Sequence, residues 1–271
     1  MKNVSGHAFD KILLTLTLVI TVIGFSFFVS ASLGIFAVNS AKFYSILVNQ
    51  STFLVLGVAG LFVTAKLFPY ELLRRYALPI FTLGLLLCFL VFVPGLGFSH
   101  GGATRWINLG FTTFQTGEFL KIAAIIYCAG WFSIFKHKIK DSRYGLIPLC
   151  CIIGLSGIAL LLQPDTDTFM VLAVACVAIY FAAGAPWRNL FILGGLGLTL
   201  IVGLVLARPY ILSRLLTFVD GTSVDVRGAG YQAYQSLLTV GSGGIVGQGI
   251  GQSVQKFGFL PEPAGDSIFA V

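Results

Sequence analysis

Asp266 is the residue whose type and position first suggest chemistry in this chain of 271 residues. It is the last charged residue before a fresh apolar run, Ile268–Val271, and it follows a stretch with nine glycines between Gly228 and Gly258. A carboxylate at the water edge of a hydrocarbon layer is costly, so it prompts a functional hypothesis. The dense glycines let a backbone approach a ligand or a bilayer surface closely. The structural alternative is a loop whose aspartate only solvates the start of a helix.

A second set of charged residues follows the third apolar run. Glu118 and Lys121 are three residues apart, hence on one face of a helix, where they can form an ion pair. Arg105 precedes Trp106, a pairing typical of an anchor at the membrane interface. The functional alternative is that Arg105 grips a phosphate group.

Two aspartates follow the fifth apolar run, in the segment that begins at Gln163. Pro164 breaks the helix there, and Asp165 and Asp167 come directly after it. Carboxylates at alternate positions are consistent with a cation site. They are equally consistent with a cap on the N-terminus of the next helix, and the spacing leaves both readings open.

The composition limits the class of protein that holds these residues. The chain is 57% hydrophobic and only 10% charged, whereas a soluble domain carries roughly 25% charged residues. We therefore predict an all-α polytopic membrane protein. The net charge of +7 does not indicate nucleic acid, because the basic residues fall mainly in short loops between apolar runs. The five cysteines lie inside apolar runs without metal-ligand spacing to a histidine.

Membrane helices need about 20 mostly apolar residues, and seven such runs are present, with an eighth beginning near Ile268. The whole chain, 1–271, is expected to form one integral membrane domain that contains a long extracytoplasmic loop, 208–267. The seven expected spans are Ile12–Leu33, Ile46–Lys66, Ala77–Pro94, Phe119–Phe135, Gly145–Leu162, Thr168–Gly184 and Leu190–Ala207.

The placement of lysine and arginine predicts the orientation of these spans. If the N-terminus is inside, the inner short segments hold ten Lys or Arg residues and the outer short segments hold three. We therefore expect a cytoplasmic N-terminus and place the 208–267 loop outside. An enzyme site in that loop would meet an extracytoplasmic substrate and no ATP.

Two amphipathic helices are expected inside the long loop. Residues 207–220 carry an apolar face flanked by Arg208 and Arg214, as in a helix that lies on the bilayer with its cations among headgroups. Residues 231–241 place Gln232 and Ser236 on a polar face that is available to a sugar or to neighbouring helices. The glycines that follow lack the spacing of a nucleotide-binding loop, and no Walker lysine follows them.

The loop sequence GYQAYQSLLTVGSGGIVGQGIGQSVQKFGFLPEPAGDSIFAV closely resembles that of the SEDS family (shape, elongation, division and sporulation). The upstream pieces GGATRWINLGFTTFQTGEFLK, QPDTDT and ARPYILSRLLTFVD agree in order, so the resemblance covers the whole chain. The sequence around Lys256 is more similar to the FtsW/SpoVE branch of the family than to the RodA branch. Family members have about ten spans, so the resemblance implies a chain that lacks the last three.

The resemblance implies a peptidoglycan glycosyltransferase of the bacterial cytoplasmic membrane. Such an enzyme polymerises lipid II with inversion to a β-1,4 linkage and releases polyprenyl diphosphate. It works beside a class B penicillin-binding protein and divisome membrane proteins, in septal wall synthesis. No nucleic acid partner and no certain cofactor are implied, although Mg²⁺ or Mn²⁺ could share the task of meeting the diphosphate. A lipid II flippase and a non-catalytic scaffold are the alternatives.

The family motifs fall on particular residues of this chain. Asp266 matches the aspartate of the PE-x-H-T-D motif and would be the catalytic base. The expected substrate-binding residues are Lys256, Arg105, Arg208, Arg214, Gln232, Ser236, Glu118, Lys121, Gln163 and Asp165. There are departures: Thr116-Gly117 replaces Pro-Ser, Asp167 stands where glycine is usual, and Pro263-Ala264-Gly265 replaces the residues that normally precede the aspartate.

Overall fold

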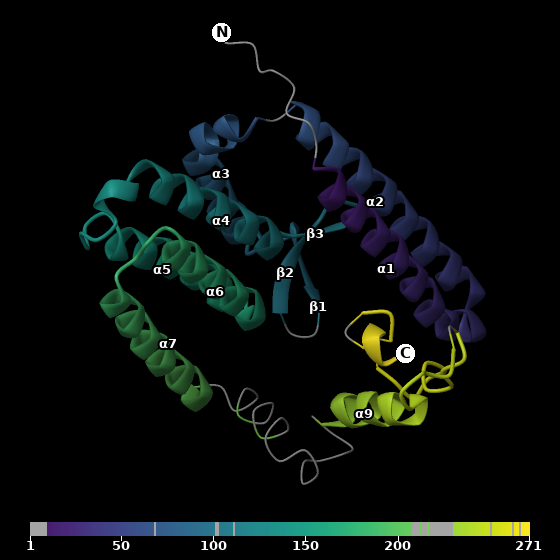
Figure 1. Ribbon diagram of the computed structural model, residues 1–271. Helices are drawn as coiled ribbons and strands as arrows, with labels where there is room; N and C mark the ends of the chain where they lie inside the picture. Colours follow the sequence, from purple (N-terminus) through teal and green to yellow (C-terminus); the bar gives the residue numbers. More distant parts are fainter. Residues whose placement is uncertain are drawn as a thin grey trace. The chain divides into compact units, whose positions relative to one another are not determined.

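Seven helices account for the seven apolar runs (Figure 1). The computed structural model describes residues 10–67, 69–100, 103–110, 112–207, 212, 216, 230–249, 251–261, 263–265 and 267–271. The helices are α1 Lys11–Val38, α2 Ser40–Leu67, α3 Tyr70–Leu90, α4 Thr116–Ile134, α5 Leu146–Leu162, α6 Thr166–Ala182 and α7 Trp187–Ala207. Among the described residues, α1 to α4 are long and apolar enough to cross a membrane, and α5 to α7 contain shorter apolar helices.

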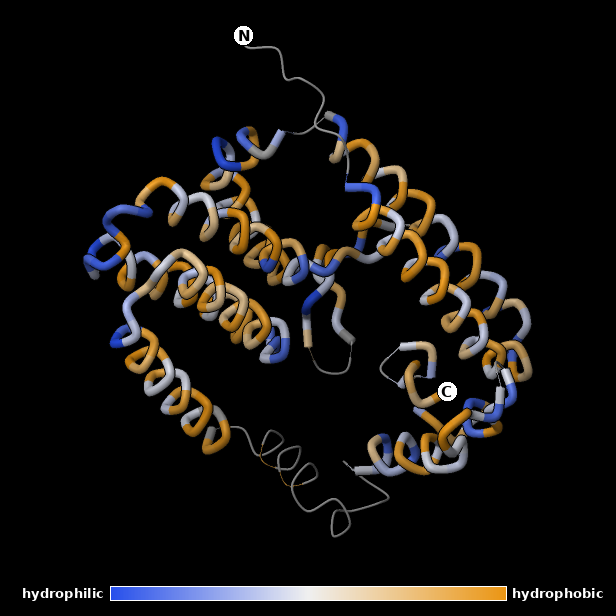
Figure 2. Tube along the Cα trace, in the orientation of Figure 1, coloured by the Kyte–Doolittle hydropathy of each residue, from blue (hydrophilic) through white to orange (hydrophobic). Residues whose placement is uncertain are grey.

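Hydrophobic residues line most of each of these helices, and hydrophilic residues gather at connections such as the one between α4 and α5 (Figure 2). The apolar windows of α1 and α2 are not buried at all within the structure. Exposed apolar surface of this extent would be unfavourable in water, whereas in hydrocarbon it has no cost and the helix satisfies its own backbone. The exposure therefore agrees with helices that face lipid.

The chain forms two compact units, which are described separately. One contains Met1–Ala65 together with Ile201–Val271, and the other contains Lys66–Leu200. The division assigns α3 to α6, most of α7 and all three strands to the second unit.

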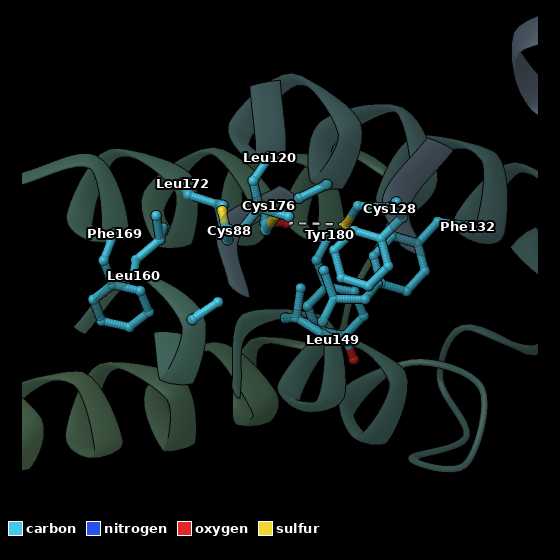
Figure 3. Packing of buried hydrophobic residues seen from close by; sticks show 14 of the residues in the cluster. Cys88, Leu120, Cys128, Phe132, Leu149, Leu160, Phe169, Leu172, Cys176 and Tyr180 are labelled. Carbon is cyan, nitrogen blue, oxygen red and sulfur yellow. Dashed lines mark hydrogen bonds between the residues drawn. The ribbon is translucent and has the colours of Figure 1, made fainter. Parts of the chain in front are cut away.

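The second unit is built around a core shared by α3, α4, α5 and α6 (Figure 3). Almost completely buried side chains come from all four helices: Cys88, Leu120, Cys128, Phe132, Leu149, Leu160, Leu172, Cys176 and Tyr180. The Tyr180 ring lies 5.1 Å from that of Phe132, and its hydroxyl accepts a 2.8 Å hydrogen bond from Asn189 at the start of α7. This packing holds the helix ends at which several expected site residues lie.

A small antiparallel sheet precedes α4, where the sequence predicted only an outer loop with an interface anchor. Its strands are β1 Gly97–His100, β2 Ala103–Asn108 and β3 Thr113–Gln115, in the order β1-β2-β3. Trp106 in β2 pairs with Phe98 on one side and with Gln115 on the other. The sheet places Arg105 at the middle of its central strand.

Besides α1 and most of α2, the first unit contains a helix and a short 3-10 turn from the last 41 residues of the sequence. Helix α9, Tyr231–Gly243, confirms the second of the two amphipathic helices expected in the long loop. The first, over residues 207–220, lies outside the described residues apart from Ala207, Leu212 and Leu216. The eighth apolar run is present as one 3-10 turn, η2 Ile268–Ala270.

Candidate active site

Arg105 and Asp165 form an ion pair at the edge of the second unit. Arg105 Nη1 lies 3.7 Å from Asp165 Oδ1, and Nη2 donates a hydrogen bond to the carbonyl of Pro164. The carboxylate is almost completely buried, with 2% of the side chain exposed, whereas the arginine side chain is 26% exposed. A buried carboxylate needs such a partner, because an unpaired charge is expensive to desolvate. Arg105 therefore neutralises Asp165 and joins β2 to the start of α6.

Asp165 is also the N-cap of α6. Its Oδ1 accepts a hydrogen bond of 3.4 Å from the backbone N–H of Thr168, one of the donors that a helix start leaves without a partner. Of the two readings that the sequence left open, the capping one is confirmed for this residue. Asp167 lies in the first turn of the same helix, where a negative charge is favourable.

Gln163 joins three elements from a site with no solvent exposure. Its Nε2 donates a hydrogen bond of 2.7 Å to the Cys88 carbonyl in the last turn of α3. The side chain also lies 3.5 Å from Thr116 Oγ1, at the first residue of α4. Carbonyls in the last turn of a helix lack intrahelical partners, so Gln163 satisfies one of them. Its described contacts are thus structural.

Replacing Gln163 with leucine is expected to lower the free energy of unfolding by about 1–3 kcal/mol, because a buried carbonyl loses its donor. Thermal unfolding of the detergent-purified protein measures the change. Gln252→Leu is the matched control, since Gln252 is exposed, and it should alter stability by no more than about 0.5 kcal/mol. Equal melting temperatures for the two variants would show that the buried amide contributes nothing special.

Thr116-Gly117, where the resemblance leads us to expect Pro-Ser, lies against the Arg105–Asp165 pair. A Cβ placed on Gly117 would lie 2.9 Å from Asp165 Oδ2, so the absence of a side chain leaves room for the carboxylate. The Thr116 hydroxyl in turn donates to the Arg105 carbonyl at 3.4 Å. Thr116 and Gly117 therefore both adjoin the Arg105–Asp165 pair.

Glu118 and Lys121 form the ion pair that their spacing predicts. Lys121 Nζ lies 2.8 Å from Glu118 Oε2 in the first turns of α4, and the glutamate side chain is 52% exposed. Pairs exposed to this extent contribute roughly 0–1 kcal/mol to stability. Both charges are accessible at the surface of the second unit.

Lys256 lies in the first unit and is buried, with 2% of its surface exposed. Its Nζ donates a 2.6 Å hydrogen bond to the Gly251 carbonyl, and it lies 5.3 Å from the centre of the Phe257 ring. Burial disfavours the charged ammonium and so lowers the pKa of Lys256. The ammonium keeps N–H groups beyond the one that Gly251 uses.

The polar face of α9 contacts the residue that follows Asp266. Gln232 Nε2 lies 3.3 Å from Ser267 Oγ, and Ser236 Oγ lies 3.4 Å from the same atom. Ser267 is itself buried, and its hydroxyl donates to the Pro261 carbonyl at 3.4 Å. Sequence reasoning missed Ser267, because nothing in its type or spacing predicts that it joins two sides of the loop.

The described site residues are divided between the two units. Arg105, Gln163 and Asp165 lie together in the second unit, which also holds the separate Glu118–Lys121 pair; Gln232, Ser236 and Lys256 lie in the first. Asp266, Arg208 and Arg214 lie outside the described residues. Within the described part of the chain, no three His, Cys, Asp or Glu residues could hold a metal ion.

Comparisons with protein-family profiles and with known proteins point to the same family. The sequence profile described as "Cell cycle protein", which covers FtsW, RodA and SpoVE, matches residues 10–271. The chain is 34% identical over 264 residues to "Stage V sporulation protein E" of Bacillus subtilis, which covers 97% of this chain and 71% of that protein. It is 33% identical over 271 residues to a "Probable peptidoglycan glycosyltransferase FtsW" of a Geobacter species, covering 100% of this chain and 73% of that protein.

Solved structures give the same fold. A chain described under "Structural coordination of polymerization and crosslinking by a peptidoglycan synthase complex" is 29% identical, with a TM-score of 0.68, over 89% of this chain and 67% of its own length. RodA of Thermus thermophilus is 24% identical with a TM-score of 0.58 over 97% of this chain, a likeness of fold. The prediction of an all-α polytopic membrane protein is confirmed, with the small sheet as an addition.

Proposed function

The chain belongs to the FtsW, RodA and SpoVE family, and on that premise we propose that it is a peptidoglycan glycosyltransferase that polymerises lipid II. The observation that best supports this is the hydrogen bonding of α9 to Ser267. Gln232 and Ser236 both reach this neighbour of Asp266, within the unit that also holds the buried Lys256. The polar helix face and the cation thus belong to the same unit, and Asp266 precedes Ser267 in the sequence.

The reaction joins two prenyl-anchored sugars. The 4-hydroxyl of the acceptor attacks the anomeric carbon of the donor from the side opposite the diphosphate, so a carbon–oxygen bond forms as the bond to the diphosphate breaks. The configuration inverts from α to β. The hydroxyl proton goes to a general base within hydrogen-bond reach, roughly 2.6–3.2 Å, and we assign that base to Asp266.

The leaving diphosphate gathers negative charge and needs cations. We assign this task to Lys256, Arg208 and Arg214, because ammonium and guanidinium groups form strong charge-assisted hydrogen bonds with phosphate oxygens. Arg105 is already paired with Asp165, so its role is to support the edge of the second unit while its exposed part faces solvent.

The setting follows from the same premise. We propose that the loop from 208 to 267 is extracytoplasmic, that the N-terminus is cytoplasmic, and that the protein acts in septal wall synthesis. The structural relative belongs to a complex that coordinates polymerization and crosslinking. We accordingly propose a class B penicillin-binding protein as the partner that crosslinks the strands.

A reconstituted assay tests the proposal against a flippase and a scaffold. The purified protein is placed in liposomes with labelled lipid II and its cognate transpeptidase, without ATP. A polymerase yields long glycan strands, which gel electrophoresis resolves. Movement of label across the bilayer without strands indicates a flippase, and neither product indicates a scaffold; both results contradict the proposal.

A further inference from the structure

Helix α1 meets the backbone of Lys256 at a glycine. The buried residues of α1 are confined to Ser30, Ala31, Ser32 and Gly34, near its C-terminal end. A Cβ placed on Gly34 would lie 2.1 Å from the carbonyl oxygen of Lys256 and 2.9 Å from its carbonyl carbon. Such distances do not occur between real atoms, so only glycine permits this approach.

A second glycine holds the other end of the same residue. Gly251 has φ +83°, a conformation that glycine adopts readily, and its carbonyl accepts the hydrogen bond of 2.6 Å from Lys256 Nζ. A Cβ on Gly251 would lie 3.9 Å from that Nζ and 4.0 Å from Ser30 Oγ, so Gly251 lies close both to the ammonium and to α1. Lysine side chains usually extend until their charge reaches water, yet this one is 2% exposed.

We propose that Gly34 and Gly251 are positioning residues that together fix the Lys256 ammonium, Gly34 through the backbone and Gly251 through its carbonyl. The effect of this positioning on catalysis rests on the proposed function. If the Lys256 ammonium binds the leaving diphosphate, then helix α1 determines the position of this positive charge. Neither glycine is assigned a contact with substrate.

The contact at Gly34 is of a kind that cannot adjust easily. Because the obstacle is the Lys256 peptide and not a flexible side chain, an added methyl group must move the backbone of the loop or of α1. A displacement of about 1 Å in a reacting or binding group can reduce a rate by about 100-fold. A substitution at Gly34 should therefore act on Lys256 directly.

The first test measures the exposure of Lys256 without any substrate. The protein in membranes is treated with a water-soluble N-hydroxysuccinimide ester, and mass spectrometry gives the labelled fraction of Lys256. Gly34→Ala and Gly251→Ala should each raise that fraction several-fold over the wild type. Gly24→Ala is the matched control on the same helix, because a Cβ there meets nothing within 4 Å. Equal labelling in all four proteins overturns the inference.

The second test asks whether Gly34 acts through Lys256. Gly34→Ala should lower kcat/KM for lipid II polymerisation by roughly 10–100-fold, and it should have little further effect in a Lys256→Gln background. Additive losses would show a general effect on the fold and contradict the inference. Should Gly34→Ala fail to insert, Gly251→Ala gives the same comparison. A wild type that makes no polymer refutes the proposed function alone, since the labelling result stands independently.

Discussion

Asp266→Asn is expected to lower lipid II polymerisation by about 100- to 10,000-fold, the range by which a positioned general base contributes to a rate. Asparagine has nearly the same shape as aspartate but accepts no proton at neutral pH. The acceptor hydroxyl would then attack with its proton in place. The rate is measured as glycan strands formed per minute from labelled lipid II, with the protein and its transpeptidase partner in liposomes.

The control for this variant is Asp141→Asn, in the connection between α4 and α5. Asp141 Oδ1 accepts a 3.0 Å hydrogen bond from the Arg143 backbone N–H, which the amide oxygen of asparagine can also accept. It should polymerise at the wild-type rate, and both variants should insert into membranes equally. Strand formation by Asp266→Asn at the wild-type rate would remove Asp266 from the mechanism.

Arg105→Ala is expected to cost about 3 kcal/mol of stability, because it leaves the buried Asp165 carboxylate without its cation. The Pro164 carbonyl loses a donor at the same time. For a protein of this size, a loss of about 3 kcal/mol corresponds to a fall of roughly 6–12 °C in Tm. Thermal unfolding of the purified protein, followed by intrinsic tryptophan fluorescence, measures the fall.

Two further variants separate this buried pair from an ordinary surface pair. Lys121→Ala breaks the exposed pair with Glu118 and should cost no more than about 1 kcal/mol. The double variant Arg105→Ala/Asp165→Ala should be more stable than Arg105→Ala alone, because the unpaired carboxylate is gone, although α6 also loses its cap. If Arg105→Ala and Lys121→Ala melted together, the burial of Asp165 would have no energetic consequence.

The helices were predictable because a bilayer leaves few choices. A segment that crosses hydrocarbon must satisfy its own backbone, so each apolar run of sufficient length becomes a helix. A helix covers most of each of the seven expected runs, but the ends differ: α2 begins at Ser40 instead of Ile46, and α1 continues to Val38 instead of ending at Leu33. Polar residues near the ends do not break a helix, which is why boundaries were less predictable than the helices themselves.

The sheet before α4 was not predictable in the same way. Its strands are three to six residues long, and His100, Thr104 and Gln115 interrupt the apolar pattern. Strand pairing depends on a partner across a turn, whereas a membrane helix depends only on its own sequence. The sequence of this segment therefore predicts a loop.

The site contacts likewise fall into two kinds, those that a local sequence pattern predicts and those that join distant segments. The Glu118–Lys121 pair follows from their spacing on one helix, and the cap at Asp165 follows from its place after a helix break. The Arg105–Asp165 pair joins β2 to α6, and the Gly34–Lys256 contact joins α1 to the end of the chain. Neither contact has a local signal, because each exists only when distant segments have packed together.

The product that the purified protein makes from lipid II decides whether it is a glycan polymerase. The protein is incubated with labelled lipid II and its transpeptidase partner, with crosslinking blocked by a β-lactam, and the product is then digested with a muramidase that cleaves β-1,4 linkages. A lipid II polymerase should give long strands that the muramidase reduces to disaccharide-peptide units, and Asp266→Asn should give no strands. Unchanged lipid II, or strands that resist the muramidase, would contradict this function.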